Sequence, residues 1–304
     1  MAKINIVQAI NQALSEEMAR DKDVVILGED VGRDGGVFRV TEGLLEKYGP
    51  SRVIDTPLAE LGIAGMAVGM AAYGLKPVVE IQFMGFIYAA IEQIFSHAGR
   101  IRSRSRGRFT CPMVIRAPYG IGIKAPELHS ESSEALFCHM PGIKVVVPST
   151  PHNAKGLLIS AIRDPDPVVF LEPARLYRSI KAEVPEGEYT VPLGRAGIYQ
   201  EGAGFTVVAW GAMLHKAAEA SEGFDCEIID LMTLKPFDEE TVLNSVKKTG
   251  RLVATVAEEA AMYLKAPILR VAGPEAVVPM ARLEDAYMPD AGRIKKAYKL
   301  IMEY

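Results

Sequence analysis

The sequence has few of the residues and motifs on which several protein classes depend. Its three cysteines, Cys111, Cys138 and Cys226, lie far apart and show no paired spacing. An odd, scattered set of this kind fits a reducing compartment better than a disulfide framework, so we expect a cytoplasmic protein. A P-loop and a Gly-x-Ser-x-Gly nucleophile elbow are both absent from the sequence. The chain therefore carries neither of these two signatures of phosphate binding and serine catalysis.

Long apolar runs and an excess of positive charge are missing too. The longest uncharged run, 61–75, is shorter than the roughly 20 residues that span a bilayer, and we expect a buried helix there and no membrane segment. The N-terminal residues follow an amphipathic helix pattern and not that of an export signal. A net charge of -4 repels phosphate backbones, which argues against nucleic-acid binding. The arginine-rich segment 99–109 lacks interleaved aromatic residues, so we interpret it as a solvated helix end or a subunit contact.

Apolar strands that alternate with helical patterns are what the sequence does contain. With 304 residues and 49% hydrophobic content, the chain can build one large core or two ordinary ones. The pattern predicts an α/β fold around mostly parallel sheets. Near-continuous Val, Ile and Leu runs are typical of strands that helices cover on both faces. The expected strands of the first half are 24–30, 52–56, 76–83, 112–118, 144–149 and 167–173.

A change in amino-acid composition divides the chain into two parts. The segment between 172 and 205 is charged and rich in Pro and Gly, and we expect it to connect a first domain, 1–185, to a second, smaller one, 186–304. In the second domain we expect strands at 206–210, 226–234 and 268–273, a helix from about Met213 and a helical tail.

The alternation of strands and helices is interrupted after the expected strand that ends near Val253. Only 257–267 would separate that strand from the next one, and this stretch contains no Gly, Asn or Asp. A parallel crossover usually needs a dozen or more residues and a turn signal. Either the strand ends by Val253, or a glycine-bearing loop is missing from this sequence.

Glu60 is the first candidate for chemistry. Thr56 and Pro57 are typical of the N-cap and first position of a helix that ends at Gly74. A carboxylate just beyond the carboxyl end of a strand lies where open α/β sheets bind their ligands. The alternative is a first-turn acid that the helix dipole stabilises.

His129 is the second candidate, because its polar segment lies between a strand and a helix, where loop histidines serve in acid-base chemistry. A solvated surface histidine is the alternative. His139 beside Cys138, with Cys111 and His152, matches no compact zinc ligand set, and we expect no zinc there.

Several motifs, in order along the chain, resemble one family. They are GEDVG at 28–32, GGVFR at 35–39, DTPLAELGIAG at 55–65, EIQFMGF at 80–86, LHSESSEALF at 128–137, FLEPARLYR at 170–178 and IIDLMTLKPFD at 228–238. The chain is similar in these motifs to the beta subunit of thiamine-diphosphate-dependent 2-oxoacid dehydrogenases. The resemblance implies a transketolase-like fold, with a pyrimidine-binding domain followed by a C-terminal domain. It also implies an alpha2-beta2 heterotetramer in which the alpha chain holds the magnesium and diphosphate; the GDG motif of that chain is absent here.

The same resemblance assigns roles to single residues. Glu60 corresponds to the carboxylate that hydrogen-bonds a ring nitrogen of the cofactor's aminopyrimidine, and Gln82 and Phe86 correspond to residues that line its pocket. His129 corresponds to the histidine that serves when the acyl group passes to lipoamide. This chain departs from the family pattern at Glu131, where relatives have Gln, and at KAPE before His129, where relatives are glycine-rich.

Further expectations from the resemblance concern a cation, a loop and the substrate. Relatives bind a monovalent cation, potassium, at positions that correspond to Met113, Ala161, Ile162, Asp164 and Asp166. They also carry a glycine-rich loop between the equivalents of Val253 and Thr255, which favours a missing loop over a short strand. The implied reaction is oxidative decarboxylation of a 2-oxoacid and acylation of the lipoyl groups of a transacylase core. The residues of these motifs favour a branched-chain 2-oxoacid as the substrate, with pyruvate as the second candidate.

Three other functions remain open. An acetoin dehydrogenase beta subunit belongs to the same family, and a non-catalytic assembly subunit would use 61–75 only as an interface. A nucleotide-binding oxidoreductase is the third, but GIGIKA at 120–125 lacks the third glycine of a dinucleotide-binding loop.

Overall fold

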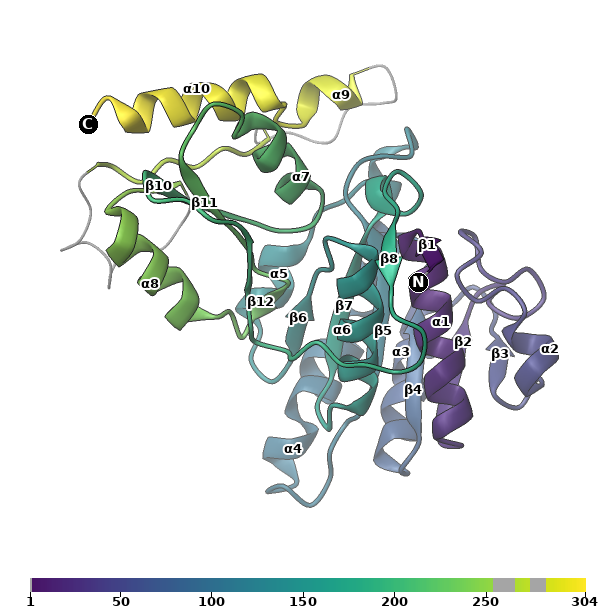
Figure 1. Ribbon diagram of the computed structural model, residues 1–304. Coiled ribbons are helices and arrows are strands. Elements are labelled where there is room, and N and C mark those ends of the chain that lie inside the picture. The colour runs from purple at the N-terminus through teal and green to yellow at the C-terminus, as the bar shows by residue number, and fades with distance from the viewer. Residues whose placement is uncertain (1, 254–265, 274–282) are drawn as a thin grey trace.

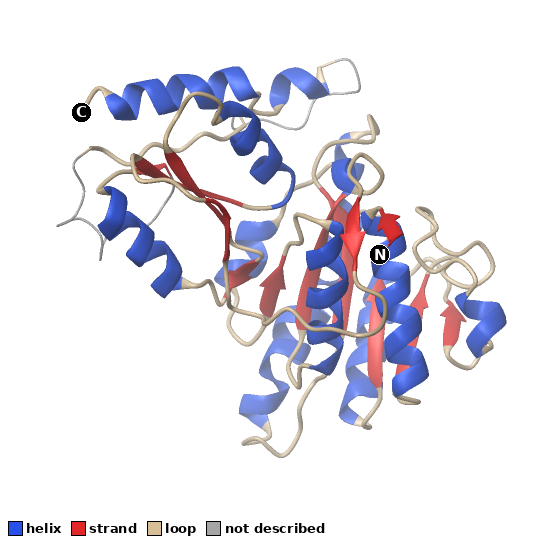
Figure 2. Cartoon of the chain, in the orientation of Figure 1, coloured by secondary structure: helices blue, strands red, loops and turns tan. Residues whose placement is uncertain are grey.

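Two main sheets organise the chain in the computed structural model, which describes residues 2–253, 266–273 and 283–304 (Figures 1 and 2). The first sheet has seven strands in the order β12-β6-β7-β5-β4-β2-β3, all parallel except β12. Their bounds are β2 Val24–Gly28, β3 Val53–Asp55, β4 Lys76–Glu80, β5 Val114–Tyr119, β6 Lys144–Val146, β7 Val168–Pro173 and β12 Thr233–Lys235. All six strands expected in the first half are present.

Helices cover both faces of this sheet, as the apolar strands require. One face packs against α1 (Ile6–Arg20) and α6 (Pro151–Arg163), and the other packs against α3 (Glu60–Ala72) and the short helices that follow β4. The remaining short helices of this half are α2 (Leu44–Tyr48), η1 (Met84–Ala90), η2 (Gln93–His97), η3 (Ala98–Arg100), α4 (Ile101–Arg104), η4 (Glu127–His129), α5 (Glu134–His139) and η5 (Ala174–Leu176).

The start of α3 differs from the prediction. The N-cap is Ala59 and not Thr56, and its side chain makes no capping bond. The reason lies in the neighbouring strand, because the Thr56 amide donates to the Gly28 carbonyl at 3.0 Å and keeps this residue extended beside β2. The helix therefore begins at Glu60 itself, at the carboxyl end of β3. Gly74, with a φ of 106°, follows its C-terminus as expected.

The second sheet has four strands in the order β13-β10-β11-β9. They are β9 Gly197–Gln200, β10 Phe205–Ala209, β11 Cys226–Asp230 and β13 Leu252–Val253, and β9 is antiparallel to β11. The helices of this half are α7 Gly211–Ala220, α8 Glu239–Thr249, α9 Glu284–Tyr287 and α10 Ala291–Met302. The segment 268–273, expected to be a strand, has no strand conformation, and among the described residues one backbone bond, from the Leu269 amide to the Leu252 carbonyl, joins it to β13. The loop expected after Val253 lies outside the described residues.

The two halves of the chain are more interwoven than the sequence suggested. The expected connection, 172–205, contains β8 (Ala182–Val184), which pairs with β1 (Ala2–Ile4), and also contains β9. Beyond it, β12 leaves the second half of the chain and adds an antiparallel edge strand to the first sheet, next to β6 (Figure 1). The second sheet consequently lies on the β12 side of the first.

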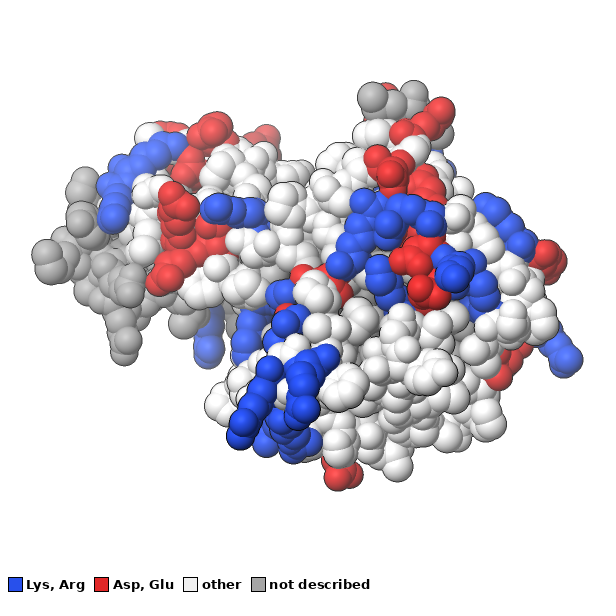
Figure 3. Space-filling view, turned by 90° about the horizontal axis from the view of Figure 1, so that it is seen from below, with Lys and Arg blue, Asp and Glu red and all other residues white. Residues whose placement is uncertain are grey.

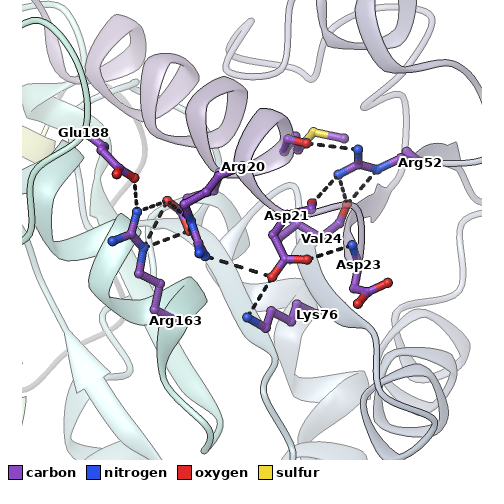
Figure 4. Close-up of polar contacts among 10 residues, drawn as sticks. Arg20, Asp21, Asp23, Val24, Arg52, Lys76, Arg163 and Glu188 are labelled. Atoms are coloured by element: carbon purple, nitrogen blue, oxygen red, sulfur yellow. Dashed lines mark hydrogen bonds and ion pairs between the residues drawn. The ribbon is translucent and has the colours of Figure 1, made fainter.

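Ion pairs fix the C-terminal end of α1, away from the carboxyl ends of the strands (Figure 4). Arg163 donates to Glu17 at 2.5 Å, so α6 is tied to α1. Lys76 pairs with Asp21 at 2.9 Å, and Arg52 donates to the Asp21 carbonyl at 2.9 Å. Among the described residues, no helix is both long and apolar enough to cross a membrane.

Candidate functional site

The carboxyl ends of three strands, β5, β4 and β3, carry the four predicted site residues, and β2 lies between β4 and β3 in the sheet. Glu60 follows β3, Gln82 and Phe86 follow β4, and His129 lies on η4 in the loop that follows β5. Because parallel strands end at one edge of the sheet, residues distant in sequence come together there. Each of the four side chains is only partly buried.

Glu60 lies beside a second carboxyl group, that of Glu29, which follows β2. Glu29 is 6% exposed, and its Oε1 has no hydrogen-bond partner among the described residues. Burial, and then the negative charges of Glu60 and Asp30, raises the pKa of Glu29, although the Ala59 amide donates to its carboxylate. The site thus pairs one partly exposed carboxyl group with one whose pKa is raised by burial.

Hydrogen bonds hold the loop after β2 against its neighbours. The Asp55 carboxylate at the end of β3 accepts from the amides of Gly32 at 2.6 Å and Arg33 at 3.0 Å. Gln82 donates to Asp30 at 3.2 Å, which connects the end of β4 to the same loop. The predicted pocket residue Gln82 therefore takes part in positioning the site.

His129 packs against two phenylalanine rings that also contact each other. Its ring centroid lies 4.3 Å from that of Phe83 and 5.3 Å from that of Phe86, and both contacts are edge-to-face. The buried Nδ1 of His129 has no partner among the described residues. The structure thus brings His129 together with Phe86 and adds Phe83, for which the sequence predicted no role at the site.

The departure from the family pattern at Glu131 has a local explanation. Tyr88 on η1 donates to the Glu131 carboxylate at 3.2 Å and shares a 2.8 Å hydrogen bond with Ser133. The carbonyl of Glu131 accepts from the Gly120 amide at 2.8 Å. Glu131 therefore helps to close the loop that presents His129.

A buried ionic cluster lies at the ends of the central strands. Arg116 on β5 is 1% exposed and donates to Glu80 on β4 at 2.9 Å and to Glu172 on β7 at 2.6 Å. Tyr177 donates to Glu172 at 2.6 Å. Burial opposes the charge on Arg116, but the carboxylates of Glu172 and Glu80 reverse this effect and raise the pKa of Arg116. The cluster cross-links three strands close to the candidate site.

The residues predicted to bind a monovalent cation gather at the C-terminal end of α6, but their side chains have other partners. Lys144 donates to both Asp164 oxygens at 2.6 Å, and Arg102 donates to Asp166 at 2.6 Å. The carbonyls of Met113 and Ala161 each accept one backbone hydrogen bond, while Ile162 is buried. Each carbonyl retains a second lone pair, so the cation site stays a prediction.

Other features of the sequence lie apart from this site. A cavity of about 1020 Å³ lies between the two sheets, and its lining includes Tyr119, Trp210 and Met213 but none of the four predicted residues. Arginines of the segment 99–109 are exposed at the opposite end of the sheet, and basic side chains gather on the face seen in Figure 3. Among the described residues, no group of three His, Cys, Asp or Glu side chains is placed to hold a metal.

Comparisons with known protein families match both halves of the chain. A model described as the transketolase pyrimidine-binding domain matches residues 2–180, and one described as the transketolase C-terminal domain matches 194–256. Two solved structures have the same fold. A chain titled split gene transketolase, inactive beta4 tetramer, has a TM-score of 0.77 and 23% identity, with 99% of each chain covered. A transketolase from Leishmania mexicana has a TM-score of 0.73 and 16% identity, and the match covers 100% of this chain and 46% of that one.

Individual proteins of similar sequence indicate the family more narrowly than the domain models do. A protein of Acholeplasma laidlawii is 50% identical, with 97% of this chain and 96% of the relative covered. Proteins of Bacillus subtilis and Staphylococcus aureus are each 45% identical, with 100% of both chains covered. All three are named pyruvate dehydrogenase E1 component subunit beta. The alignment with the Bacillus protein spans 325 positions against the 304 residues of this chain, which indicates that the relative has residues that this chain lacks.

Proposed function

The chain belongs to the family of beta subunits of the 2-oxoacid dehydrogenases, and from this premise we propose that it forms the pyrimidine-binding half of the thiamine diphosphate site in a pyruvate-decarboxylating enzyme. In this proposal the enzyme decarboxylates the 2-oxoacid oxidatively and acylates the lipoyl groups of a transacylase core. The observation that carries the proposal is the convergence of Glu60, Gln82, Phe86 and His129 at the carboxyl ends of adjacent strands. We take 1–185 as the pyrimidine-binding domain and 186–304 as the C-terminal domain.

Pyruvate replaces the branched-chain acids as the first candidate substrate. The motif wording favoured a branched-chain acid, but the relatives at 45–50% identity are named for pyruvate. Substrates that differ by a few methylene or methyl groups are separated by small differences in pocket shape, which short motifs do not reveal. Branched-chain acids therefore become the second candidate.

The residues at this edge fit the aminopyrimidine of thiamine diphosphate. Buried polar atoms without a partner among the described residues occur here on three neighbouring segments, at Glu29 Oε1, Thr56 Oγ1 and His129 Nδ1. Such atoms are costly unless a bound group satisfies them. Phe86 would contact the ring, and Glu60 and Gln82 would offer the polar contacts. When bound, thiamine diphosphate supplies a thiazolium ring that accepts the electron pair released by decarboxylation.

Each residue has one task in this proposal. Glu60 holds a proton at a ring nitrogen of the aminopyrimidine and so favours the tautomer that accepts a proton on its other nitrogen. Burial of Glu29 disfavours a second negative charge beside the Glu60 carboxylate. His129 would donate or accept a proton when the acyl group moves to the lipoyl group.

The partner we propose is an alpha subunit, in an alpha2-beta2 heterotetramer. Part of α3 is apolar yet open to solvent, with Leu61 49% and Met66 41% exposed, and Leu58 just before it is 80% exposed. Several exposed apolar side chains of this kind, on or next to one helix, are a candidate protein interface. Because Glu60 begins this helix, a chain that covers it would close the site and bring the residues for magnesium and diphosphate. The potassium ion at Asp164 and Asp166 belongs to the same proposal.

Reconstitution with the alpha chain tests the function. We expect the purified complex, with thiamine diphosphate and a lipoyl domain, to show a kcat/KM for pyruvate about tenfold or more above that for 3-methyl-2-oxobutanoate. A preference for the branched acid, or for acetoin, would reverse the substrate assignment. A complex that assembles but turns over none of the three would indicate an assembly subunit.

A further inference from the structure

No hydrogen bond from a described residue orients the His129 ring. Its side chain makes none to any described residue, and Nδ1 is buried. In most working histidines, the bond made by one ring nitrogen fixes which nitrogen carries the proton and where the other points. The orientation of this ring must therefore come from packing against its neighbours.

Phe83 is the nearer of the two rings that pack on His129, at 4.3 Å against 5.3 Å for Phe86. The backbone of the two segments is also in close contact. A Cβ on Gly85 would lie 2.5 Å from the Leu128 carbonyl oxygen, so only glycine lets η1 approach η4 this closely. The segment that carries Phe83 and Phe86 therefore determines the place of His129.

Phe83 itself is held from the other side. Phe38, in the loop after β2, lies 5.7 Å from Phe83 and 4.9 Å from Tyr177. Tyr177 donates to Glu172 of the buried ionic cluster at 2.6 Å. A row of rings, Tyr177, Phe38 and Phe83, thus runs from the cross-linked strands of the sheet to His129. We call it the aromatic row.

We propose that Phe83 and Phe38 are positioning residues that fix the orientation of the His129 ring by packing. The consequence for acyl transfer rests on the proposed function. Aromatic rings in edge-to-face contact restrict one another, and each ring of the aromatic row is restrained by the one before it. Displacement of a reacting group by about 1 Å can cost a hundredfold in rate, so loosening the aromatic row would slow the step that uses His129.

Histidine NMR tests the positioning without any assay of activity. The chain has five histidines, so the full-length protein labelled only at histidine gives few ring signals, and His129→Gln identifies the one from His129. We expect Phe83→Leu to shift the His129 signal more than the signal of any other histidine. Phe38→Leu should shift the His129 signal less, and Phe83→Tyr should leave it close to its position in the wild type. Phe95→Leu is the matched control, because Phe95 makes the same kind of ring pair with Phe137, at 5.6 Å, elsewhere in the first half of the chain. An unmoved His129 signal in Phe83→Leu, or an equal shift in Phe95→Leu, would overturn the inference.

Kinetics of the reconstituted complex separates this inference from the proposed function. We expect Phe83→Leu to lower kcat for lipoyl acylation about tenfold or more, with the KM for the 2-oxoacid unchanged. Phe83→Tyr should keep a kcat close to that of the wild type. Decarboxylation followed with an artificial oxidant should change much less. If the His129 signal moves while acylation stays normal, the role proposed for His129 fails although the positioning stands.

Discussion

Arg116 links β5 to β4 and β7 through buried ion pairs. It is almost fully buried and holds two carboxylates from neighbouring strands. Its loss would leave Glu80 and Glu172 buried without a countercharge. We expect Arg116→Met to lower the free energy of unfolding by about 3–5 kcal/mol, measured by urea titration.

Arg102→Met is the control for that substitution. Arg102 also makes a 2.6 Å ion pair, with Asp166, but its side chain is 45% exposed. An exposed pair contributes about 1 kcal/mol or less, so this variant should remain close to the wild type. Equal losses in the two variants would show that burial does not set the strength of the Arg116 cluster.

The role of a residue was predictable where the residue lies in a matching motif. It was not predictable where the role depends on packing between distant segments. The motifs gave Glu60, Gln82, Phe86 and His129, and the structure places all four at one edge of the first sheet; their roles stay predictions. Glu29 was missed although a signal existed, since it is the first acid after an apolar strand. Phe83 gave no signal, because an aromatic residue near a strand end is typical of core packing.

At the scale of the elements, local sequence patterns predicted the strands correctly where every residue of a strand is buried. The strands of the first sheet were predicted because runs such as 24–28 are buried throughout. Predictions failed where distant contacts decide: Thr56 stays extended beside β2, and β12 joins the first sheet although its sequence belongs to the second half. Neither partner strand is visible in the local pattern. The cytoplasmic location expected from the cysteines stays a prediction.

The exposed face of α3 makes its own prediction. Met66 is 41% exposed, so Met66→Lys should leave the fold intact while placing a charge where the alpha chain would bind. We expect the affinity for the alpha chain to fall about tenfold or more, measured by titration calorimetry. Leu300→Lys on α10, where Leu300 is 47% exposed, is the control. Unchanged affinity in Met66→Lys would place the interface on another surface.

At the scale of the whole molecule, one buried acid connects the two sheets. Asp230, at the end of β11, accepts from Ser149 at 2.7 Å and from Asn153 on α6 at 3.3 Å. Ser149 in turn accepts from the Gly211 amide of α7 at 2.8 Å. Burial raises the pKa of Asp230 to about 6 despite these hydrogen bonds.

The sign of the resulting pH dependence follows from that raised pKa. Folding favours the protonated form of Asp230, so its contribution to stability is present in full below about pH 4 and is lost as the pH rises through about 6. Relative to Asp230→Asn, the wild type should lose up to about 3 kcal/mol of unfolding free energy between pH 4 and pH 7. Urea titrations at several pH values measure this difference. Parallel pH profiles for the two proteins would contradict it.

The central claim concerns one carboxyl group at the carboxyl end of β3, in a site that a second chain completes. Its most direct test is the decarboxylation rate of Glu60→Gln, reconstituted with the alpha chain and saturated with thiamine diphosphate and pyruvate. Glu46→Gln, an exposed acid on α2, is the control. We expect Glu60→Gln to assemble normally and to lose at least about a hundredfold in kcat, while Glu46→Gln keeps full activity. A correctly assembled Glu60→Gln enzyme with a rate near that of the wild type would contradict the account.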